Sequence, residues 1–310
     1  MSKHAAFFAR LSVAALLCMF AAGLLAQEPN AAPFEPAPIV LPDAPPPRQM
    51  SEVRAILGDK LSAPADPNVK PLRIVLCASE KDQAHAKSGL HDYPLWRSRW
   101  TRLLGMAPGI TAEPANDWPT AGQWEKAGVI AINSHNPAWS AEKDPAKIAE
   151  LTAQIDAFLA RGGGLVFIHW SVSAGEHSTA LAARLGLAAR PGIRVRGGAS
   201  DWVLDKNHPL AAGFGAWQIQ DESYWNLIGD LAAANAQVLA TSLEENEARP
   251  QMWTREVGAG RVFVSIPGHF TWTHDDPLYR ILILRGMMWS ARQPIDRLAP
   301  LSIVGARVAE

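Results

Sequence analysis

Residues 161–171 read Arg-Gly-Gly-Gly-Leu-Val-Phe-Ile-His-Trp-Ser. The three glycines are expected to end a helix and turn the chain tightly, because glycine adopts a positive φ without a Cβ clash. Four apolar residues follow without alternation, which indicates a strand buried on both faces, as in the middle of a parallel sheet. His169 stands where this strand should end, and ligands of open α/β sheets bind at that edge. We therefore expect His169 to belong to a functional site.

The rest of the chain repeats this pairing of apolar strands with amphipathic helices. Strands are predicted over residues 72–78, 109–113, 127–133 and 261–266, and helices over residues 94–104, 144–161, 176–185 and 276–292. Their alternation predicts an α/β fold with a mostly parallel central sheet covered on both faces. Between residues 190 and 255 the pattern changes to short strand-like pieces, and residues 221–224 are expected to lie in a loop between them.

The first 26 residues have the pattern of a secretory signal peptide. Lys3 and Arg10 precede an apolar run over residues 11–25, which is shorter than the ~20 residues of a membrane span. Cleavage is expected after Ala26, although Leu24 is less typical than alanine at its position and leaves an uncleaved anchor open. We predict an exported protein, periplasmic or extracellular, that meets the membrane only through this signal.

Beyond the signal, residues 27–71 read as a Pro/Ala-rich tether with a short N-terminal segment, and residues 72–310 as one folded domain. A net charge of −1 and the absence of a basic run argue against a nucleic-acid partner. Cys77 is the only cysteine outside the signal, so the mature chain cannot form an internal disulfide. The sequence does not determine the oligomeric state.

Polar, titratable residues follow four of the predicted strands. The carboxyl ends of parallel strands meet at one edge of a sheet, so these side chains can converge although they are far apart in sequence. Imidazoles and carboxylates suit Zn²⁺ or a similar metal, and they also suit acid/base catalysis near neutral pH. Spacing alone supports no metal motif, and each histidine by itself could equally be a hydrogen-bonded loop residue. The residues are His85, His91, Asp92, His135, His169, Asp221, Glu222 and His269.

Twelve tryptophans raise the question of sugar stacking. Trp96, Trp100 and Trp289 fall on apolar helix faces and are expected in the core. Trp170, Trp225 and Trp272 neighbour the polar edge, so they are the candidates to line a sugar pocket.

A serine nucleophile is the alternative chemistry at the glycine-led strand. A strand that turns sharply into a helix is typical of a nucleophile elbow, yet His169 occupies the tip. Ser171 and Ser173 follow it without the Gly-x-Ser-x-Gly context, which disfavours acyl transfer by serine.

Several motifs, which follow one another in order along the chain, resemble those of the ThuA-like (trehalose-utilisation-like) family, within the class I glutamine amidotransferase-like superfamily. The resemblance covers residues 72–292 and implies a flavodoxin-like three-layer sandwich. Amidotransferase relatives carry a catalytic cysteine where this sequence has His169, so the resemblance implies no glutaminase activity. It also implies a role in carbohydrate use, including oxidised (3-keto) disaccharides. The motifs are Gly89-Leu90-His91-Asp92-Tyr93, residues 162–169, Asp221-Glu222-Ser223-Tyr224, Pro267-Gly268-His269, Asp276-Pro277 and Trp289.

Two classes of function follow from these observations. The first is an enzyme acting on a sugar or keto-glycoside as an isomerase, lyase or hydrolase. In it, His91, His169 and His269 bind a divalent metal such as Zn²⁺ or polarise the substrate, and Glu222, His169 or Asp221 supply acid/base catalysis. The small carbohydrate would be bound by His85, Asp92, His135, Trp170, Trp225 and Trp272. The second is a non-catalytic carbohydrate-binding or interaction domain that uses the same residues.

Overall fold

The computed structural model describes residues 44–63, 69–81 and 89–310. The predicted signal peptide, residues 27–43 of the predicted tether and His85 lie outside these ranges. Within them, no helix combines the length and the apolar character needed to cross a membrane.

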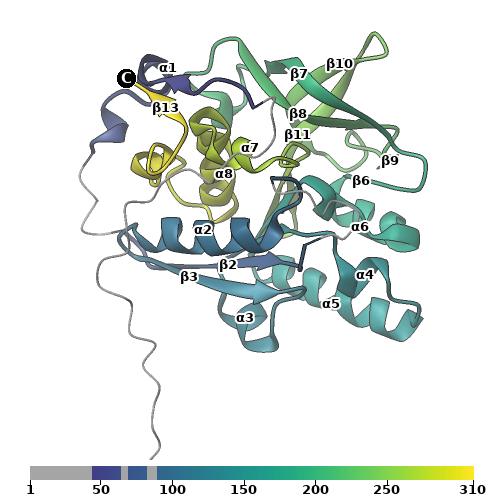
Figure 1. Cartoon of the computed structure of the whole chain (residues 1–310). Coiled ribbons are helices and arrows are strands. Elements are labelled where there is room, and N and C mark those ends of the chain that lie inside the picture. The colour runs from purple at the N-terminus through teal and green to yellow at the C-terminus, as the bar shows by residue number, and fades with distance from the viewer. Residues whose placement is uncertain (1–43, 64–68, 82–88) are drawn as a thin grey trace, which may run out of the picture. The chain divides into compact units, whose positions relative to one another are not determined.

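The central sheet has nine strands in the described part of the chain, in the order β3-β2-β4-β5-β12-β11-β10-β7-β8. Figure 1 shows β2 and β3 beneath α2, and the long strands β7, β8 and β10 in another part of the domain. The nine strands are β2 Leu72–Ala78, β3 Ile110–Asn116, β4 Val129–Asn133, β5 Gly164–Ile168, β7 Arg194–Leu204, β8 Trp217–Trp225, β10 Gln237–Glu244, β11 Glu247–Val257 and β12 Gly260–Ser265.

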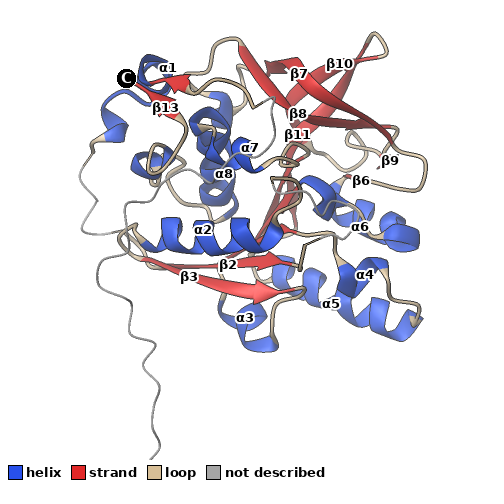
Figure 2. Cartoon of the chain, viewed as in Figure 1, coloured by secondary structure: helices blue, strands red, loops and turns tan. Residues whose placement is uncertain are grey.

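The sheet is mixed, so the prediction of a mostly parallel sheet is wrong. Strands β3, β2, β4, β5 and β12 pair in parallel, and their order is the 2-1-3-4-5 order of doubly wound flavodoxin-like sheets. From β12 onward, β11, β10, β7 and β8 are all antiparallel to their neighbours. Figure 2 shows β7, β8 and β10 in a strand-rich region with few helices around it. These strands carry alternating exposed and buried residues, because one of their faces meets solvent.

Helices cover both faces of the parallel strands. Successive strand residues point to opposite faces, so Ile74 belongs to one buried cluster and Val75 to the other. Helices α2 and α8 pack over the first face, and α5 and α6 over the second. The α-helices are α1 Met50–Leu57, α2 Tyr93–Gly105, α3 Ala121–Lys126, α4 Pro137–Ser140, α5 Pro145–Ala160, α6 Ser178–Leu185, α7 Thr271–Asp275 and α8 Pro277–Ser290.

Short elements complete the domain. The 3₁₀ turns are η1 Gly58–Leu61, η3 His169–Val172, η4 Gly175–His177, η5 Pro209–Ala211 and η6 Ala299–Ser302. Two further strand pairs are β6 Leu187–Ala188 with β9 Ile228–Gly229, and β1 Arg48–Gln49 with β13 Val308–Ala309. Val53 and Leu57 of α1 lie in the same buried cluster as α2 and α8, so this N-terminal segment packs into the core.

Two of the three glycines at residues 162–164 are needed for different reasons. Gly162 has φ +91°, the left-handed conformation expected where a helix ends. A Cβ on Gly164 would lie 2.6 Å from the backbone oxygen of Ser290, so glycine there lets α8 approach β5 closely. The prediction of a glycine-led turn is confirmed at Gly162, whereas Gly164 serves packing.

Replacing Gly164 with alanine should therefore lower the free energy of unfolding by about 1–3 kcal/mol, because the backbone of α8 must shift. Chemical denaturation measures this. The matched control is Gly122→Ala in α3, where an added Cβ meets nothing within 4 Å; this change should raise stability by roughly 0.5–1 kcal/mol. Equal stabilities for the two variants would contradict the packing explanation.

Candidate functional site

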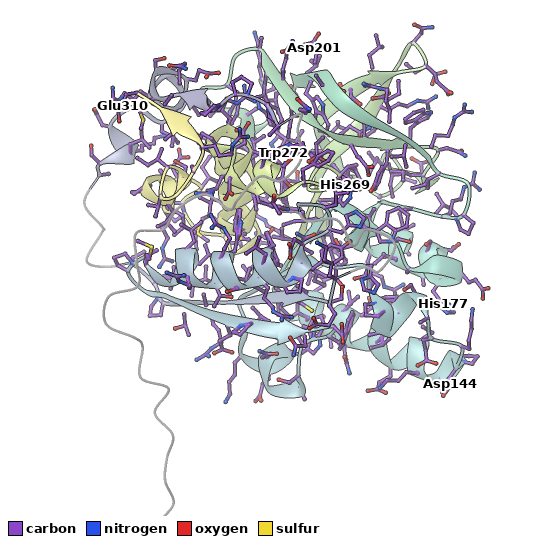
Figure 3. All side chains as sticks on the ribbon, viewed as in Figure 1. Asp144, His177, Asp201, His269, Trp272 and Glu310 are labelled. Atoms are coloured by element: carbon purple, nitrogen blue, oxygen red, sulfur yellow. The ribbon has the colours of Figure 1, made fainter. Side chains whose placement is uncertain are left out.

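Three buried histidines converge at the carboxyl edge of the parallel strands. His169 Nε2 lies 2.9 Å from His91 Nε2 and 3.2 Å from His269 Nδ1, and the last two nitrogens are 2.8 Å apart. His91 comes from the loop before α2, His169 follows β5, and His269 follows β12. The predicted convergence of these strand ends is therefore confirmed. Figure 3 shows His269 in the interior of the domain and near Trp272.

The tautomer of His169 follows from its hydrogen bonds. Nδ1 lies 2.8 Å from the carbonyl oxygen of Ile266, which can only accept, so Nδ1 carries the proton. The neutral ring then presents the lone pair of Nε2 to His91 and His269. Histidines that bind metals commonly donate their other N–H to a backbone carbonyl in this way.

The geometry of the three nitrogens fits a first-row transition metal. With metal–nitrogen bonds of about 2.0–2.1 Å and tetrahedral angles, ligand nitrogens lie about 3.4 Å apart. The observed separations of 2.8–3.2 Å are a few tenths of an ångström shorter. His91, His169 and His269 are the group of described histidine, cysteine and acidic residues able to hold an ion.

Burial keeps the His169 ring uncharged. The pKa of His169 lies well below its usual range, first because the ring is fully buried and second because His91 and His269 repel a further positive charge. A neutral imidazole is the form that binds a metal. His169 also holds a φ of +55°, and His91 one of +41°. Such backbone conformations cost roughly 1–3 kcal/mol each and are concentrated at functional sites.

Glu222 lies beside the three histidines. Its Oε2 is 3.4 Å from His269 Nδ1 and 3.7 Å from His169 Nε2, and its side chain is 21 % exposed. The carboxylate is thus close to the cluster while reachable from solvent. Residues 221–224 belong to strand β8, so the prediction that they lie in a loop is wrong.

Asp221 holds the loop that carries His269. Its Oδ1 accepts hydrogen bonds from the backbone N–H groups of Glu222, Gly268 and His269, and its Oδ2 accepts one from the Thr273 hydroxyl. Burial raises the pKa of this carboxyl to about 6, while the four hydrogen bonds act in the opposite direction. Both oxygens are used inside the protein, so Asp221 orients the site, and Glu222 is the better placed base.

The remaining candidates lie around the cluster. Asp92 is the residue before α2 and lies 3.7 Å from Lys81 Nζ. His135 follows β4, and its Nδ1 lies 2.8 Å from the Ser79 hydroxyl. The rings of His91, Tyr93 and His135 form a row with centroid separations of 5.3 and 5.9 Å. These contacts connect His135 to the cluster through Tyr93.

The three candidate tryptophans lie in different surroundings. Trp170 packs edge-on against Tyr224, and Trp272 stacks on Phe270 with ring centroids 4.1 Å apart. Trp272 also donates its indole N–H to the Gln220 carbonyl. Trp225 donates to Glu245, in the β10–β11 turn. Trp170 contacts the histidine cluster through the ring of Tyr224, and Trp272 contacts it through the ring of Phe270. Trp225 lies next to the turn.

Sequence reasoning missed Tyr224 as a site residue. Its hydroxyl oxygen lies 3.0 Å from His169 Nε2 and 3.1 Å from Glu222 Oε2. The pKa of this buried phenol lies well above its usual value because of burial and the nearby Glu222 carboxylate. Had residues 221–224 been recognised as a strand, the two-residue period would have placed Glu222 and Tyr224 on the same face.

The protein is thus a mixed α/β domain with a histidine cluster at the carboxyl ends of its parallel strands. The sequence profile of the family named ThuA and described as trehalose utilisation matches residues 129–290, more than half of the chain. The chain belongs to this family, and the predicted recognition is confirmed. The family's amidotransferase-like fold is consistent with the predicted superfamily.

Solved structures support the same fold. A ThuA-like protein from Parabacteroides merdae ATCC 43184 matches with a TM-score of 0.54 and 17 % identity, over 72 % of this chain and 90 % of its own. A ThuA-like protein from Bacteroides uniformis ATCC 8492 matches with a TM-score of 0.55 and 12 % identity, over 76 % and 99 %. At these identities the likeness shows the fold alone. No curated protein sequence matches this chain.

Removing the Asp221 carboxylate should destabilise the domain strongly. Asp221→Ala leaves three backbone N–H groups and a hydroxyl without their acceptor, at roughly 1–3 kcal/mol for each group that stays buried and unpaired. Asp221→Asn keeps one acceptor oxygen and should cost less. Chemical denaturation compares both with Asp201→Ala, which removes an exposed carboxylate that accepts from the Gln218 side chain. A loss no larger than that of the control would contradict the role of Asp221.

Proposed function

We propose that this protein is an exported enzyme of carbohydrate metabolism that acts on a sugar or keto-glycoside with the help of a divalent metal. The observation that carries the proposal is the convergence of three buried imidazole nitrogens within 2.8–3.2 Å of one another. Membership of a family described as trehalose utilisation makes a carbohydrate-related role plausible. A neutral sugar also suits a chain with a net charge of −1 and no basic run.

In this proposal His91, His169 and His269 hold the metal, with Zn²⁺ as the first candidate. When bound there, the ion would supply Lewis-acid polarisation of a substrate carbonyl or hydroxyl oxygen. Glu222 acts as the general base, because its oxygen lies 3.4 Å from His269 Nδ1 and remains partly exposed to an incoming substrate. Asp221 fixes the His269 loop. His169 acts as a metal ligand and not as a general acid, because the proton on its Nδ1 is held in a hydrogen bond to the Ile266 carbonyl.

Proton removal next to a carbonyl is the chemistry that this arrangement suits. A carboxylate takes the proton, and the site stabilises charge that develops on the carbonyl oxygen. Isomerisation and elimination of a keto-sugar begin with such a step, and so does hydrolysis when it proceeds by elimination followed by addition of water. His135, Asp92, Trp170 and Trp272 surround the cluster and are proposed to contact the sugar, as are Trp225 and His85.

The proposal contains no glutaminase chemistry. A flavodoxin-like, amidotransferase-like architecture would place a cysteine nucleophile at the end of β5, and this chain has His169 there with φ +55°. Cys77 is fully buried in β2, and burial raises the pKa of its thiol far above the range in which a thiolate forms.

Metal analysis tests the proposal directly. The chain from residue 27 to 310 should contain stoichiometric divalent metal, and His169→Ala and His269→Ala should each lose it, because each removes one of three ligands. The matched control is His177→Ala, which changes a histidine that contacts the Glu142 carbonyl at the edge of the domain in Figure 3. Elemental analysis of the purified proteins gives the answer.

A wild-type protein that contains no metal, and that takes up none when Zn²⁺ is added, would contradict the proposal of a metal-dependent enzyme. Sugar binding that survives chelation without turnover, measured by calorimetry, would instead support the non-catalytic carbohydrate-binding function.

Export is tested on the cell and not on the purified domain. The apolar run over residues 11–25 behind Lys3 and Arg10 supports it. Expressed from its full gene, the protein should be found in the exported fraction with Gln27 as its N-terminal residue. Fractionation followed by N-terminal sequencing checks both points, and a chain that starts at Met1 in the cytoplasm would contradict them.

A further inference from the structure

Tyr224 places its hydroxyl between the proposed base and the histidine cluster. Its hydroxyl lies between His169 Nε2, at 3.0 Å, and Glu222 Oε2, at 3.1 Å. Glu222 and Tyr224 are two residues apart on β8, so both side chains leave the same face of the strand. The phenol has one proton to donate, and in this structure its hydroxyl donates to Glu222 Oε2, between the proposed base and the histidine cluster.

Gln251 on β11 holds Tyr224 from behind. The side-chain Oε1 of Gln251 accepts the Tyr224 backbone N–H at 3.0 Å, and its Nε2 donates to the Tyr224 carbonyl at 2.9 Å. Strands β8 and β11 are not neighbours in the sheet, since β10 and β7 lie between them. A side-chain amide offers the same donor and acceptor as a peptide group, so Gln251 replaces the missing strand partner.

The same glutamine also supports His169. The backbone carbonyl of Gln251 accepts the backbone N–H of Ile266 at 2.8 Å. The backbone carbonyl of Ile266 in turn accepts a hydrogen bond from His169 Nδ1 at 2.8 Å. A closed ring of contacts therefore runs through Gln251, Tyr224, His169 and Ile266. Gln251 is fully buried, so water does not compete for its amide. The ring fixes the phenol relative to the imidazole.

We propose that Tyr224 is a catalytic residue that donates a hydrogen bond to the substrate oxygen on which negative charge develops, and that Gln251 is the positioning residue that holds it there. The inference rests on the proposed function and adds a donor to the site. Fixed donors aimed at a developing oxyanion typically contribute about 10²–10³ in rate.

The step is balanced without an oxidant or reductant. Glu222 takes the proton from the carbon next to the carbonyl, the electrons of that C–H bond form a C=C bond, and the carbonyl π electrons move to the oxygen. Tyr224 donates its O–H hydrogen bond to this oxygen and keeps its proton. Return of the proton from Glu222 to the same carbon completes an exchange. Its return to the former carbonyl carbon completes an isomerisation, in which the hydroxyl on the neighbouring carbon transfers its proton to the enolate oxygen and becomes the new carbonyl.

Solvent exchange measures this step without knowledge of the natural product. The probe is methyl 3-keto-α-D-glucopyranoside in D₂O, and ¹H NMR follows deuterium incorporation next to the carbonyl by zinc-loaded protein. Tyr224→Phe should keep its zinc and exchange about 100-fold more slowly. Gln251→Met should lose roughly 10- to 100-fold, because a donor displaced by about 1 Å loses much of its effect.

A double-mutant cycle separates positioning from general weakening of the fold. If Gln251 acts through the phenol, the Tyr224→Phe, Gln251→Met double variant should exchange at the rate of Tyr224→Phe alone. Gln251→Glu, which keeps the Oε1 acceptor, replaces Gln251→Met if that variant does not fold. The control is Gln218→Met on β8, the strand of Tyr224, which should exchange at the wild-type rate.

Three outcomes would overturn the inference. Zinc-loaded Tyr224→Phe that exchanges like the wild type removes the role of Tyr224 and leaves the proposed function intact. Losses that multiply in the double variant remove the positioning role of Gln251. A zinc-loaded wild type without exchange overturns the acid/base reaction itself, and this inference with it.

Discussion

The hydrogen bond from His169 Nδ1 to the carbonyl oxygen of Ile266 determines the state of the site. It joins the end of β5 to the end of β12, two adjacent parallel strands, and it fixes which ring nitrogen faces the cluster. Because the ring is fully buried, no water molecule can take over the role of the carbonyl. The lone pair directed at His91 and His269 is therefore a consequence of sheet geometry.

Burying so many polar groups is costly unless each finds a partner. At the His269 loop and at Tyr224, the domain meets this requirement with side chains that serve several backbone groups at once. Asp221 gathers the loop of His269, and Gln251 completes the backbone hydrogen bonding of Tyr224. These two residues touch no substrate in our proposal. Asp221 fixes the loop that follows β12, and Gln251 fixes the end of β8. Catalytic groups need such fixed positions.

The parallel half of the domain could be predicted from the sequence because its signals are local. Val129–Asn133 and Gly164–Ile168 are apolar runs that end in polar residues, and parallel topology brings such ends together. His91, His169 and His269 were found in this way. The glycines of residues 162–164 were also recognised, although only the structure shows that Gly164 is required by the approach of Ser290.

In the antiparallel half, the sequence predicted only short strand-like pieces, and there are physical reasons why the long strands were not recognised. The β10–β11 hairpin turns at Glu245 and Asn246, whose φ values of +52° and +64° fit a two-residue turn usually signalled by Asn-Gly. Glutamate at its first position gives no such signal. Residues 221–224 begin with three polar residues, Asp-Glu-Ser, without apolar alternation, so Glu222 and Tyr224 were predicted to lie in a loop. The contact of Tyr224 with Gln251 joins two strands that are not neighbours, and no local pattern reports it.

The pairing of β1 with β13 has a consequence for the order of folding. Arg48 pairs with Val308, so the first described strand meets nearly the last residues of the chain. Arg48 also binds Asp276, at the start of α8. During synthesis, β1 has no strand partner among the described residues until β13 has been made. Contacts of such long sequence separation carry the largest loop-closure cost. Strand β1 therefore pairs with β13 only after Val308 has been synthesised, later than the strands of the central sheet.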